Sequence, residues 1–333
     1  MKNRATLSDV AKIAGVTMMT VSRAFNNKPG VSDKLRQQII EIAKEIDYQP
    51  NQIARGLATN QTNTVGLVVP DNTNPFFAQI ARGVEDQAYE TGYNIFLINT
   101  VEDPAREQKA LDSLWGKGVD GLILCSSRLP DSRLKKEIEH FSAAVLLNRE
   151  LKVPIRTAIS INLNHRRSGE LAVGHFINQG RRNIAYINGP ESSHSGQKRL
   201  EGFKMGLEAA NFSFDDRPVE RSAPDTQSGY DAARKLLTAN PDIDAIYAFN
   251  DLVAVGALMY CLEHGKRVPQ DIAIIGNDDI PLAAMIRPQL TTLHFNEMYI
   301  GRLIMRTLLE MVTGETSPTT IQIEPELYIR ETA

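Results

Sequence analysis

The chain has 333 residues, of which 42% are hydrophobic and 23% charged, and its formal net charge is −3 at pH 7. This composition excludes a fibrous or disordered chain, and the length predicts two or three globular domains. No apolar run is long enough to span a membrane and residues 1–5 do not begin a signal peptide, so we expect a cytoplasmic protein. Cys125 and Cys261 lie in apolar contexts whose spacing suits neither a metal site nor a redox pair, so we expect buried thiols.

The charge is distributed unevenly along the chain. Residues 1–60 carry nine Lys or Arg against five Asp or Glu, whereas residues 61–333 carry 28 against 35. A basic segment on an acidic body fits a partner with phosphates at one end. A solvated helical face could give the same modest excess.

Residues 6–25 predict two short helices joined by a turn. Thr6 and Asp9 have the spacing of a capping box, after which Val10, Ile13 and Ala14 fall on one helical face. Gly15 suits the turn, and Thr17 can cap a second helix whose Val21 and Ala24 face inward. The pattern indicates a helix-turn-helix, with the second helix placed to enter a DNA major groove. The alternative is a small helical bundle that binds nothing.

A third helix follows, capped by Ser32, and its apolar stripe closes a small core. Its apolar positions are Leu35, Ile39, Ile42, Ala43 and Ile46. Residues 51–58 form a further possible helix, capped by Asn51, that is too short to be stable alone.

Three motifs in this region resemble the DNA-binding end of the lac repressor/galactose repressor family of bacterial transcriptional regulators. They are T-L-x-D-V-A-x-x-A-G-V-x-x-x-T-V-S-R from Thr6 to Arg23, Y-x-P-N from Tyr48, and A-R-x-L-A from Ala54. The resemblance extends to the C-terminus. It implies that Met18, Met19 and Arg23 read bases and that Leu57 is an apolar wedge in the minor groove. The candidate DNA-binding residues are Thr6, Thr17, Met18, Met19, Thr20, Ser22, Arg23, Asn26, Asn51, Ala54, Arg55 and Leu57.

The chemistry of these side chains agrees with the implied roles. Arg23 can bind guanine O6 and N7 through two hydrogen bonds, and methionines can pack on a thymine methyl group. Methionine at both positions departs from the polar residues often found there, which leaves the operator sequence open. Inserted Leu57 would unstack a base step. The alternatives are a core role for Leu57 and surface positions for Met18 and Met19.

From residue 65 the pattern changes to short apolar strands alternating with helices. The expected strands are 65–69, 94–99, 121–125, 144–147, 158–161, 184–188, 245–249 and 272–276. The alternation predicts an α/β fold with doubly wound parallel sheets, and its restart near residue 160 predicts two subdomains with a ligand cleft at the carboxyl ends of their strands. The family resemblance implies a periplasmic-binding-protein-like core with chain crossovers near residues 160–163, 290–294 and 322–326.

These expectations give four parts. They are a helix-turn-helix domain (1–50), a hinge helix and linker (51–60), an N-terminal core subdomain (61–161 with 292–323) and a C-terminal core subdomain (162–291 with 324–333).

Polar and aromatic side chains follow five of the expected strands. The candidate effector-binding residues are Asp71, Asn74, Phe76, Phe77, Asn148, Ser195, Arg199, Asn250 and Asp278. Asp278 and Arg199 could each bind vicinal hydroxyls of a polyol, and Phe76 or Phe77 could stack on a sugar face. Most of these positions match residues that line the effector site in the family. The alternatives are structural: Asp251 is expected to cap the next helix, Asp278 could only shape a turn, and Arg199 could lie on the surface.

Other functions lack their usual motifs. The sequence has no phosphate-binding loop, no Gly-x-Ser-x-Gly elbow and no paired histidines, so we expect no enzyme, no catalytic residue, no cofactor and no metal site. A transport-type binding protein would need a signal peptide and has no use for a helix-turn-helix. We therefore expect a nucleoid-associated transcriptional regulator that acts as a repressor and is controlled by a small-molecule effector.

Three features concern its partners. The chain shows no leucine heptad tail, so we expect a homodimer that places two recognition helices on a near-palindromic operator. A carbohydrate effector is favoured over a purine because the candidate pocket is rich in partners for hydroxyls. The run from Arg287 to Thr292 resembles a segment of family members that use a phosphorylated carrier protein as co-repressor, so a phosphocarrier partner stays open.

Overall fold

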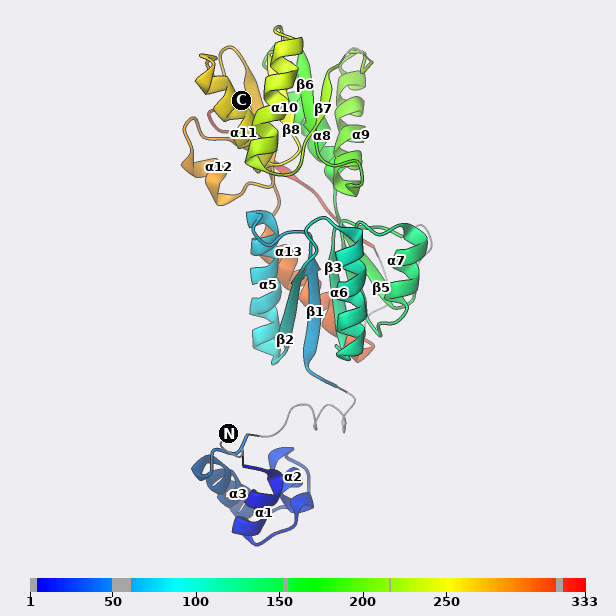
Figure 1. The fold of residues 1–333 in the computed structure, drawn as a ribbon, viewed down its shortest axis with the longest axis vertical. Helices are drawn as coiled ribbons and strands as arrows, with labels where there is room; N and C mark the ends of the chain where they lie inside the picture. Colours follow the sequence, from blue (N-terminus) through cyan, green and yellow to red (C-terminus); the bar gives the residue numbers. More distant parts are fainter. Residues whose placement is uncertain (1–4, 50–60, 152–154, 216, 316–319) are drawn as a thin grey trace. The chain divides into compact units, whose positions relative to one another are not determined.

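The computed structural model describes residues 5–49, 61–151, 155–215, 217–315 and 320–333. These belong to two compact units, Met1–Thr62 and Asn63–Ala333 (Figure 1). The expected hinge helix at residues 51–60 lies outside the described residues, as do the candidates Asn51, Ala54, Arg55 and Leu57.

The first unit contains the helices α1 (Leu7–Ala14), α2 (Met18–Phe25) and α3 (Asp33–Glu45). The capping box is confirmed: Asp9 N donates to Thr6 Oγ1 over 3.3 Å and Thr6 N donates to Asp9 Oδ2 over 2.9 Å. Gly15 has a φ of +65°, as the turn requires. Val10, Val21 and Ile39 form the centre of a small core that joins all three helices. On the predicted apolar face of α1, Val10 is buried but Ile13 is 56% exposed, and Ala11 is the second buried residue of this helix.

The second unit is built on two six-stranded sheets, each forming one subdomain (Figure 1). The first sheet contains β1 (Thr64–Val69), β2 (Asn94–Asn99), β3 (Gly121–Cys125), β4 (Ala144–Leu147), β5 (Ala158–Leu163) and β11 (Ile321–Ile323), in the order β11-β5-β4-β3-β1-β2. Its strand pairs are parallel. The helices α5 (Pro75–Thr91) and α13 (Glu297–Thr313) pack on one face, and α6 (Pro104–Gly116) and α7 (Asp131–Ile138) pack on the other.

The second sheet has the same design. It contains β6 (Ile184–Asn188), β7 (Val219–Arg221), β8 (Ala245–Ala248), β9 (Ala273–Asn277), β10 (Thr291–His294) and β12 (Glu326–Tyr328), in the order β12-β10-β9-β8-β6-β7. Only the pairing of β10 with β12 is antiparallel among the described strands of this sheet. The helices α8 (His165–Asn178) and α9 (His194–Ala209) cover one face, and α10 (Thr226–Ala239) and α11 (Asp251–Glu263) cover the other. The short α12 (Pro281–Met285) precedes β10.

The chain crosses between the two sheets at residues 164, 295–296 and 324–325. The first crossover follows Leu163, because β5 continues its pairing with β11 to that residue. The second lies later than residues 290–294, because β10 pairs with β9 and so belongs to the second sheet. The predicted subdomain boundary between residues 291 and 292 divides β10 and assigns residues 292–294 to the first subdomain, whereas β10 belongs to the second sheet.

The described helices include none that is both long and apolar enough to cross a membrane. Cys125 and Cys261 are buried free thiols, as expected, and burial raises the pKa of each to about 12.

Candidate functional site

Helix α2 carries the exposed residues of the candidate DNA-binding face. The side chains of Met18 and Met19 are 55% and 65% exposed, and Arg23 is also exposed. Thr20 and Ser22 are half-buried. The two methionines are neighbours at the start of α2, and their contact with DNA stays a prediction.

The other described candidates near α2 have structural bonds. Thr6 caps α1, and Thr17 caps α2 by accepting a hydrogen bond from Thr20 N over 3.2 Å. Asn26 Nδ2 donates to Ser22 O over 2.8 Å at the end of α2. These residues fix the ends of the two helices, and their contact with DNA stays a prediction.

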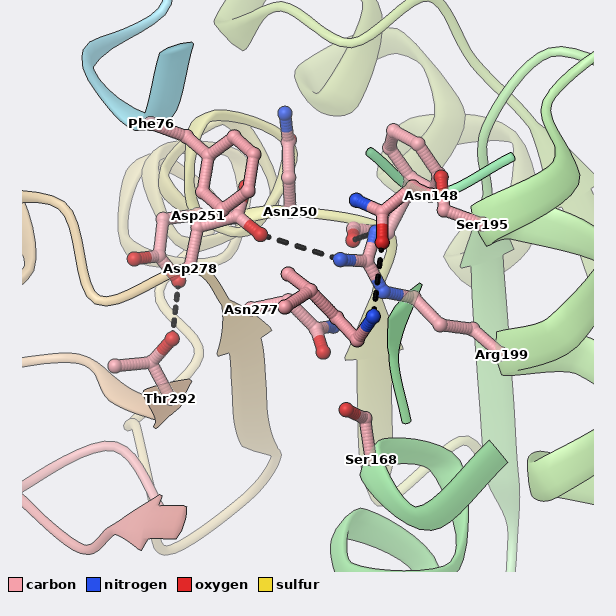
Figure 2. A network of polar contacts seen from close by, with 12 residues as sticks. Phe76, Asn148, Ser168, Ser195, Arg199, Asn250, Asp251, Asn277, Asp278 and Thr292 are labelled. Atoms are coloured by element: carbon pink, nitrogen blue, oxygen red, sulfur yellow. Dashed lines mark hydrogen bonds and ion pairs between the residues drawn. The ribbon is translucent and has the colours of Figure 1, made fainter. Parts of the chain in front are cut away.

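All nine candidate effector-binding residues line one cavity between the two subdomains. The first subdomain supplies Asp71, Asn74, Phe76, Phe77 and Asn148, and the second supplies Ser195, Arg199, Asn250 and Asp278. Figure 2 shows several of them facing one another around Arg199. The strand-end reasoning therefore brings the right residues together, while their binding of an effector stays a prediction.

The first subdomain contributes amides and an aromatic pair. Asn74 caps α5 by accepting a hydrogen bond from Phe76 N over 3.0 Å, which fixes the start of that helix at the cavity. Phe76 and Phe77 meet edge to face, with ring centroids 5.1 Å apart. Asn148 Oδ1 accepts from Leu163 N over 3.1 Å. Asn74 and Asn148 accept these bonds through oxygen, so the bonds do not use their NH₂ groups.

A buried ion pair forms the wall of the second subdomain. Arg199 Nη2 lies 3.2 Å from Asp278 Oδ1, and Arg199 Nη1 donates to Phe249 O over 2.8 Å (Figure 2). The two charged residues are only 3% and 5% exposed. Burial raises the pKa of Asp278 to about 7, although Arg199 acts in the opposite direction. Arg199 is thus a cavity residue and not a surface arginine.

The helix cap predicted for Asp251 is wrong. Asn250 caps α11, because its Oδ1 accepts from Val253 N over 2.9 Å. Asp251 is completely buried and holds the turn after β9: it accepts from Ile280 N over 2.9 Å and from Thr292 Oγ1 over 2.6 Å. Asn250 was a site candidate, and it lines the cavity while acting as the cap.

Six further residues line the cavity and were not predicted. They are Glu102, Ser126, Arg128, His165, Pro224 and Phe249. Ser126 and Phe249 directly follow β3 and β8, so the strand-end rule could have found them. Arg128 Nε lies 2.5 Å from Glu102 Oε2, which gives the first subdomain a second ion pair at the cavity. The sequence gives no signal for this pair, because its residues are 26 positions apart.

A separate contact bridges the two subdomains. Arg149, which follows β4, hydrogen-bonds to His194 at the start of α9. Arg149 Nη2 also lies 2.7 Å from Asp131 Oδ1 and from Leu129 O. Burial and the charge of Arg149 lower the pKa of His194 to about 4, so His194 is neutral at pH 7.

Comparison with known proteins covers both units. Residues 6–51 match the family described as bacterial regulatory proteins, lacI family, and residues 62–331 match periplasmic binding proteins and sugar binding domain of LacI family. The ribose operon repressor of Halalkalibacterium halodurans is 37% identical over 333 residues, covering 98% of this chain and 96% of the relative. The HTH-type transcriptional repressor PurR of Mannheimia succiniciproducens is 33% identical over 330 residues, covering 98% of each chain.

The crystal structure of the lac repressor dimer bound to operator and the anti-inducer ONPF is also similar. It is 27% identical, covers 99% of both chains and gives a TM-score of 0.90. The ribose operon repressor and PurR are both transcriptional repressors and not enzymes. Since the similarity extends over both units, this chain belongs to the lacI family of bacterial regulatory proteins, DNA-binding transcriptional repressors with a ligand-binding domain of the periplasmic-binding type.

Proposed function

We propose that this repressor binds a near-palindromic operator as a homodimer and is controlled by an uncharged sugar or sugar derivative in the cavity between its subdomains. The observation that carries the proposal is the composition of that cavity. It combines two ion pairs, Arg128 with Glu102 and Arg199 with Asp278, with the aromatic pair Phe76 and Phe77.

The charge balance supports an uncharged ligand. Each arginine of the cavity has its own carboxylate, so no cation is left over to neutralise a phosphate or carboxylate of the ligand. Paired guanidinium and carboxylate groups offer donors and acceptors together, which suits the vicinal hydroxyls of a sugar. An aromatic ring can then cover an apolar face of the sugar. A purine would also stack but would leave more of these polar groups without partners.

Exposed apolar residues support the homodimer. Phe96 and Leu97 of the edge strand β2 are 45% and 42% exposed, and in the second subdomain Met259 and Met285 are 45% and 72% exposed. An exposed apolar edge strand is prone to unwanted pairing unless a partner covers it. A two-fold axis would present two copies of α2 to the half-sites of an operator in the bacterial cytoplasm, and the similar lac repressor structure is itself a dimer on operator.

Effector control then follows from the two-subdomain design. A sugar that contacts both walls changes the preferred angle between the subdomains, and this angle shifts the equilibrium between operator-binding and released forms. By linkage, operator must change the sugar affinity by the same factor.

The first experiment is thermal unfolding of the protein with a ligand panel. The panel contains D-ribose, D-xylose, D-glucose, D-galactose, their phosphates, and the purines adenine and hypoxanthine. A ligand at 100 times its Kd stabilises the fold by about 2.7 kcal/mol, which is a shift of several degrees in Tm. A neutral sugar that also changes operator affinity supports the proposal. Stabilisation by a purine or a phosphate alone overturns the effector class, and no response would direct attention to a protein co-regulator near the exposed Arg287.

The dimer is tested by sedimentation of a β2 variant. Leu97→Glu is expected to shift the protein toward monomer and to weaken operator binding. Trp115→Glu is the matched control, because Trp115 near the end of α6 is 57% exposed and its ring stacks on His140, which follows α7. A monomeric wild-type protein at micromolar concentration contradicts the proposal.

A further inference from the structure

His165 is a cavity residue whose hydrogen-bonding groups are unsatisfied. It is the first residue of α8, lines the cavity and is only 4% exposed. Neither Nδ1 nor Nε2 has a hydrogen-bond partner among the described residues. Buried polar groups in native proteins are nearly always hydrogen-bonded, so this ring needs a partner that the described chain does not supply.

The surroundings of His165 fix the ring and its charge. Its ring meets Phe295 edge to face, with centroids 5.9 Å apart, and Phe295 lies in the second crossover. Helix α9 approaches the first turn of α8 closely, since a Cβ on Gly202 would lie 1.9 Å from Arg166 O. This approach brings Arg199 near His165. Burial and the positive charge of Arg199 lower the pKa of His165 well below its ordinary value, which keeps the imidazole neutral.

A neutral imidazole has one N–H donor and one bare nitrogen acceptor. A carboxylate or phosphate oxygen could accept from the N–H but could not donate to the bare nitrogen. The guanidinium of Arg199 cannot accept a hydrogen bond at all. A hydroxyl group can act in either sense, so it can satisfy whichever nitrogen faces the ligand.

We propose that His165 binds a hydroxyl group of the effector and thereby helps to select a polyhydroxylated ligand. The inference rests on the proposed sugar effector and deepens it, because it assigns one hydroxyl of that sugar to one side chain. Among the residues of the cavity, His165 is also placed directly after the first crossover of the chain, at residue 164.

The test compares His165→Phe with the wild type. Phenylalanine keeps an aromatic ring against Phe295 but removes both nitrogens. We expect the Kd for the sugar that binds wild type best, among D-ribose, D-xylose, D-glucose and D-galactose, to rise about 10-fold to 100-fold. The Tm of the sugar-free variant should not fall, because an unsatisfied buried group is removed. His175→Phe on the same helix is the matched control, since His175 already pairs with Gln179 over 3.0 Å.

Monodeoxy analogues of the same sugar identify the hydroxyl. The analogue that lacks the hydroxyl bound by His165 should bind the wild type about as weakly as the parent sugar binds His165→Phe. The affinity of this analogue should be the same for His165→Phe as for the wild type. His165→Asn and His165→Gln place an amide near Nδ1 and Nε2 respectively, and one of them should bind the sugar better than His165→Phe. These two variants keep the test decisive if the phenylalanine variant folds poorly.

The outcomes separate the two proposals. If wild type binds a neutral sugar and His165→Phe binds it equally well, the role of His165 is overturned while the proposed effector class stands. If each deoxy analogue loses affinity relative to the parent sugar by the same factor in the wild type and in His165→Phe, the hydroxyl assignment is also wrong. If wild type binds no sugar of the panel, the effector class itself fails, and the assignment to His165 falls with it.

Discussion

The buried pair Arg199–Asp278 should tolerate the loss of both partners better than the loss of either. Removing one member of a buried ion pair costs about 3 to 5 kcal/mol, because the remaining partner must either stay charged out of water or, if it is a carboxylate, take up a proton. Arg199→Met also removes the hydrogen bond to Phe249 O, whereas Asp278→Asn leaves a guanidinium that cannot lose its proton. The double variant leaves no buried charge at this position.

These costs translate into measurable shifts. For domains of this size 1 kcal/mol changes Tm by about 2 to 4 °C, so each single variant should lose at least about 6 °C. The double variant should be more stable than the sum of the single effects predicts, by about 1 to 3 kcal/mol. None of the three variants should bind the sugar that stabilises wild type.

The cost of Arg199→Met should also depend on pH. The pKa of Asp278 is raised to about 7 in the folded protein, so its contribution to stability is complete below pH 3.8 and is lost as the pH rises through 7. Without Arg199 the pKa of Asp278 rises further. Arg199→Met therefore continues to lose stability above pH 7, where the stability of the wild type no longer depends on Asp278. The deficit should therefore grow by up to about 1.4 kcal/mol per pH unit above pH 7.

Thermal unfolding of the four proteins at pH 6 and pH 8 measures both effects. The exposed pair Arg267–Asp271 is the matched control: its closest atoms are 2.6 Å apart, but the arginine side chain is 74% exposed. Arg267→Met and Asp271→Asn should each leave the Tm nearly unchanged, because water and salt screen an exposed pair. Strict additivity at Arg199 and Asp278, or a cost of Arg199→Met that is the same at both pH values, would refute the reasoning.

Three further predictions concern other parts of the chain. Thr6→Ala removes one side of the capping box and should destabilise the first unit by about 1 kcal/mol; calorimetry should show the loss, and Thr6→Ser should retain most of the stability. Arg23→Ala should weaken specific operator binding by about 1 to 3 kcal/mol at fixed salt, measured by fluorescence anisotropy, while equal weakening on random DNA would contradict a base contact. The pKa of His194 is lowered to about 4, so wild type should lose stability relative to His194→Asn as the pH falls from 6.5 toward 4; parallel Tm profiles would contradict this.

The sequence predicted which residues meet at the cavity because parallel strands end at a common edge. Asn148 and Asp278 each directly follow a strand, and such positions can be read from an apolar run without knowing its neighbours. The order of the strands is harder to infer. The boundary predicted between residues 291 and 292 divides β10, because this four-residue segment has one apolar residue, Leu293, and gives no clear strand pattern. Its pairing with β9 and β12 assigns it to the second sheet.

Side-chain roles depended on contacts that are distant in the sequence. Asn250 and Asp251 are both good capping residues, and the choice between them was settled by Thr292 and the backbone of Ile280, about 30 to 40 positions away, which occupy the Asp251 carboxylate. His165 carried no signal, because nothing near it in sequence shows that its ring would be buried without partners. Local pattern predicts the element, and long-range contacts decide what the side chain does.

The backbone at the cavity connects these observations. Ser126, Asn148 and Asp278 each follow a strand directly, and their φ values are +50°, +56° and +103°. In each case the backbone N–H still donates to the neighbouring strand, to Leu147 O, Ile161 O and Leu293 O respectively, over distances of 2.8 to 2.9 Å. The sheet therefore holds each residue in the left-handed conformation at the last rung of its ladder.

Such a conformation costs of order 1 to 3 kcal/mol for a residue other than glycine, and it persists only where the surroundings impose it. Glycine would relieve this strain at all three positions but would remove the side chain that lines the cavity. The strain occurs in both subdomains and at the ends of β3, β4 and β9, so both walls are fixed before a ligand arrives. A ligand that meets prearranged walls spends little of its binding energy on ordering them, and more of that energy is left to bias the angle between the subdomains.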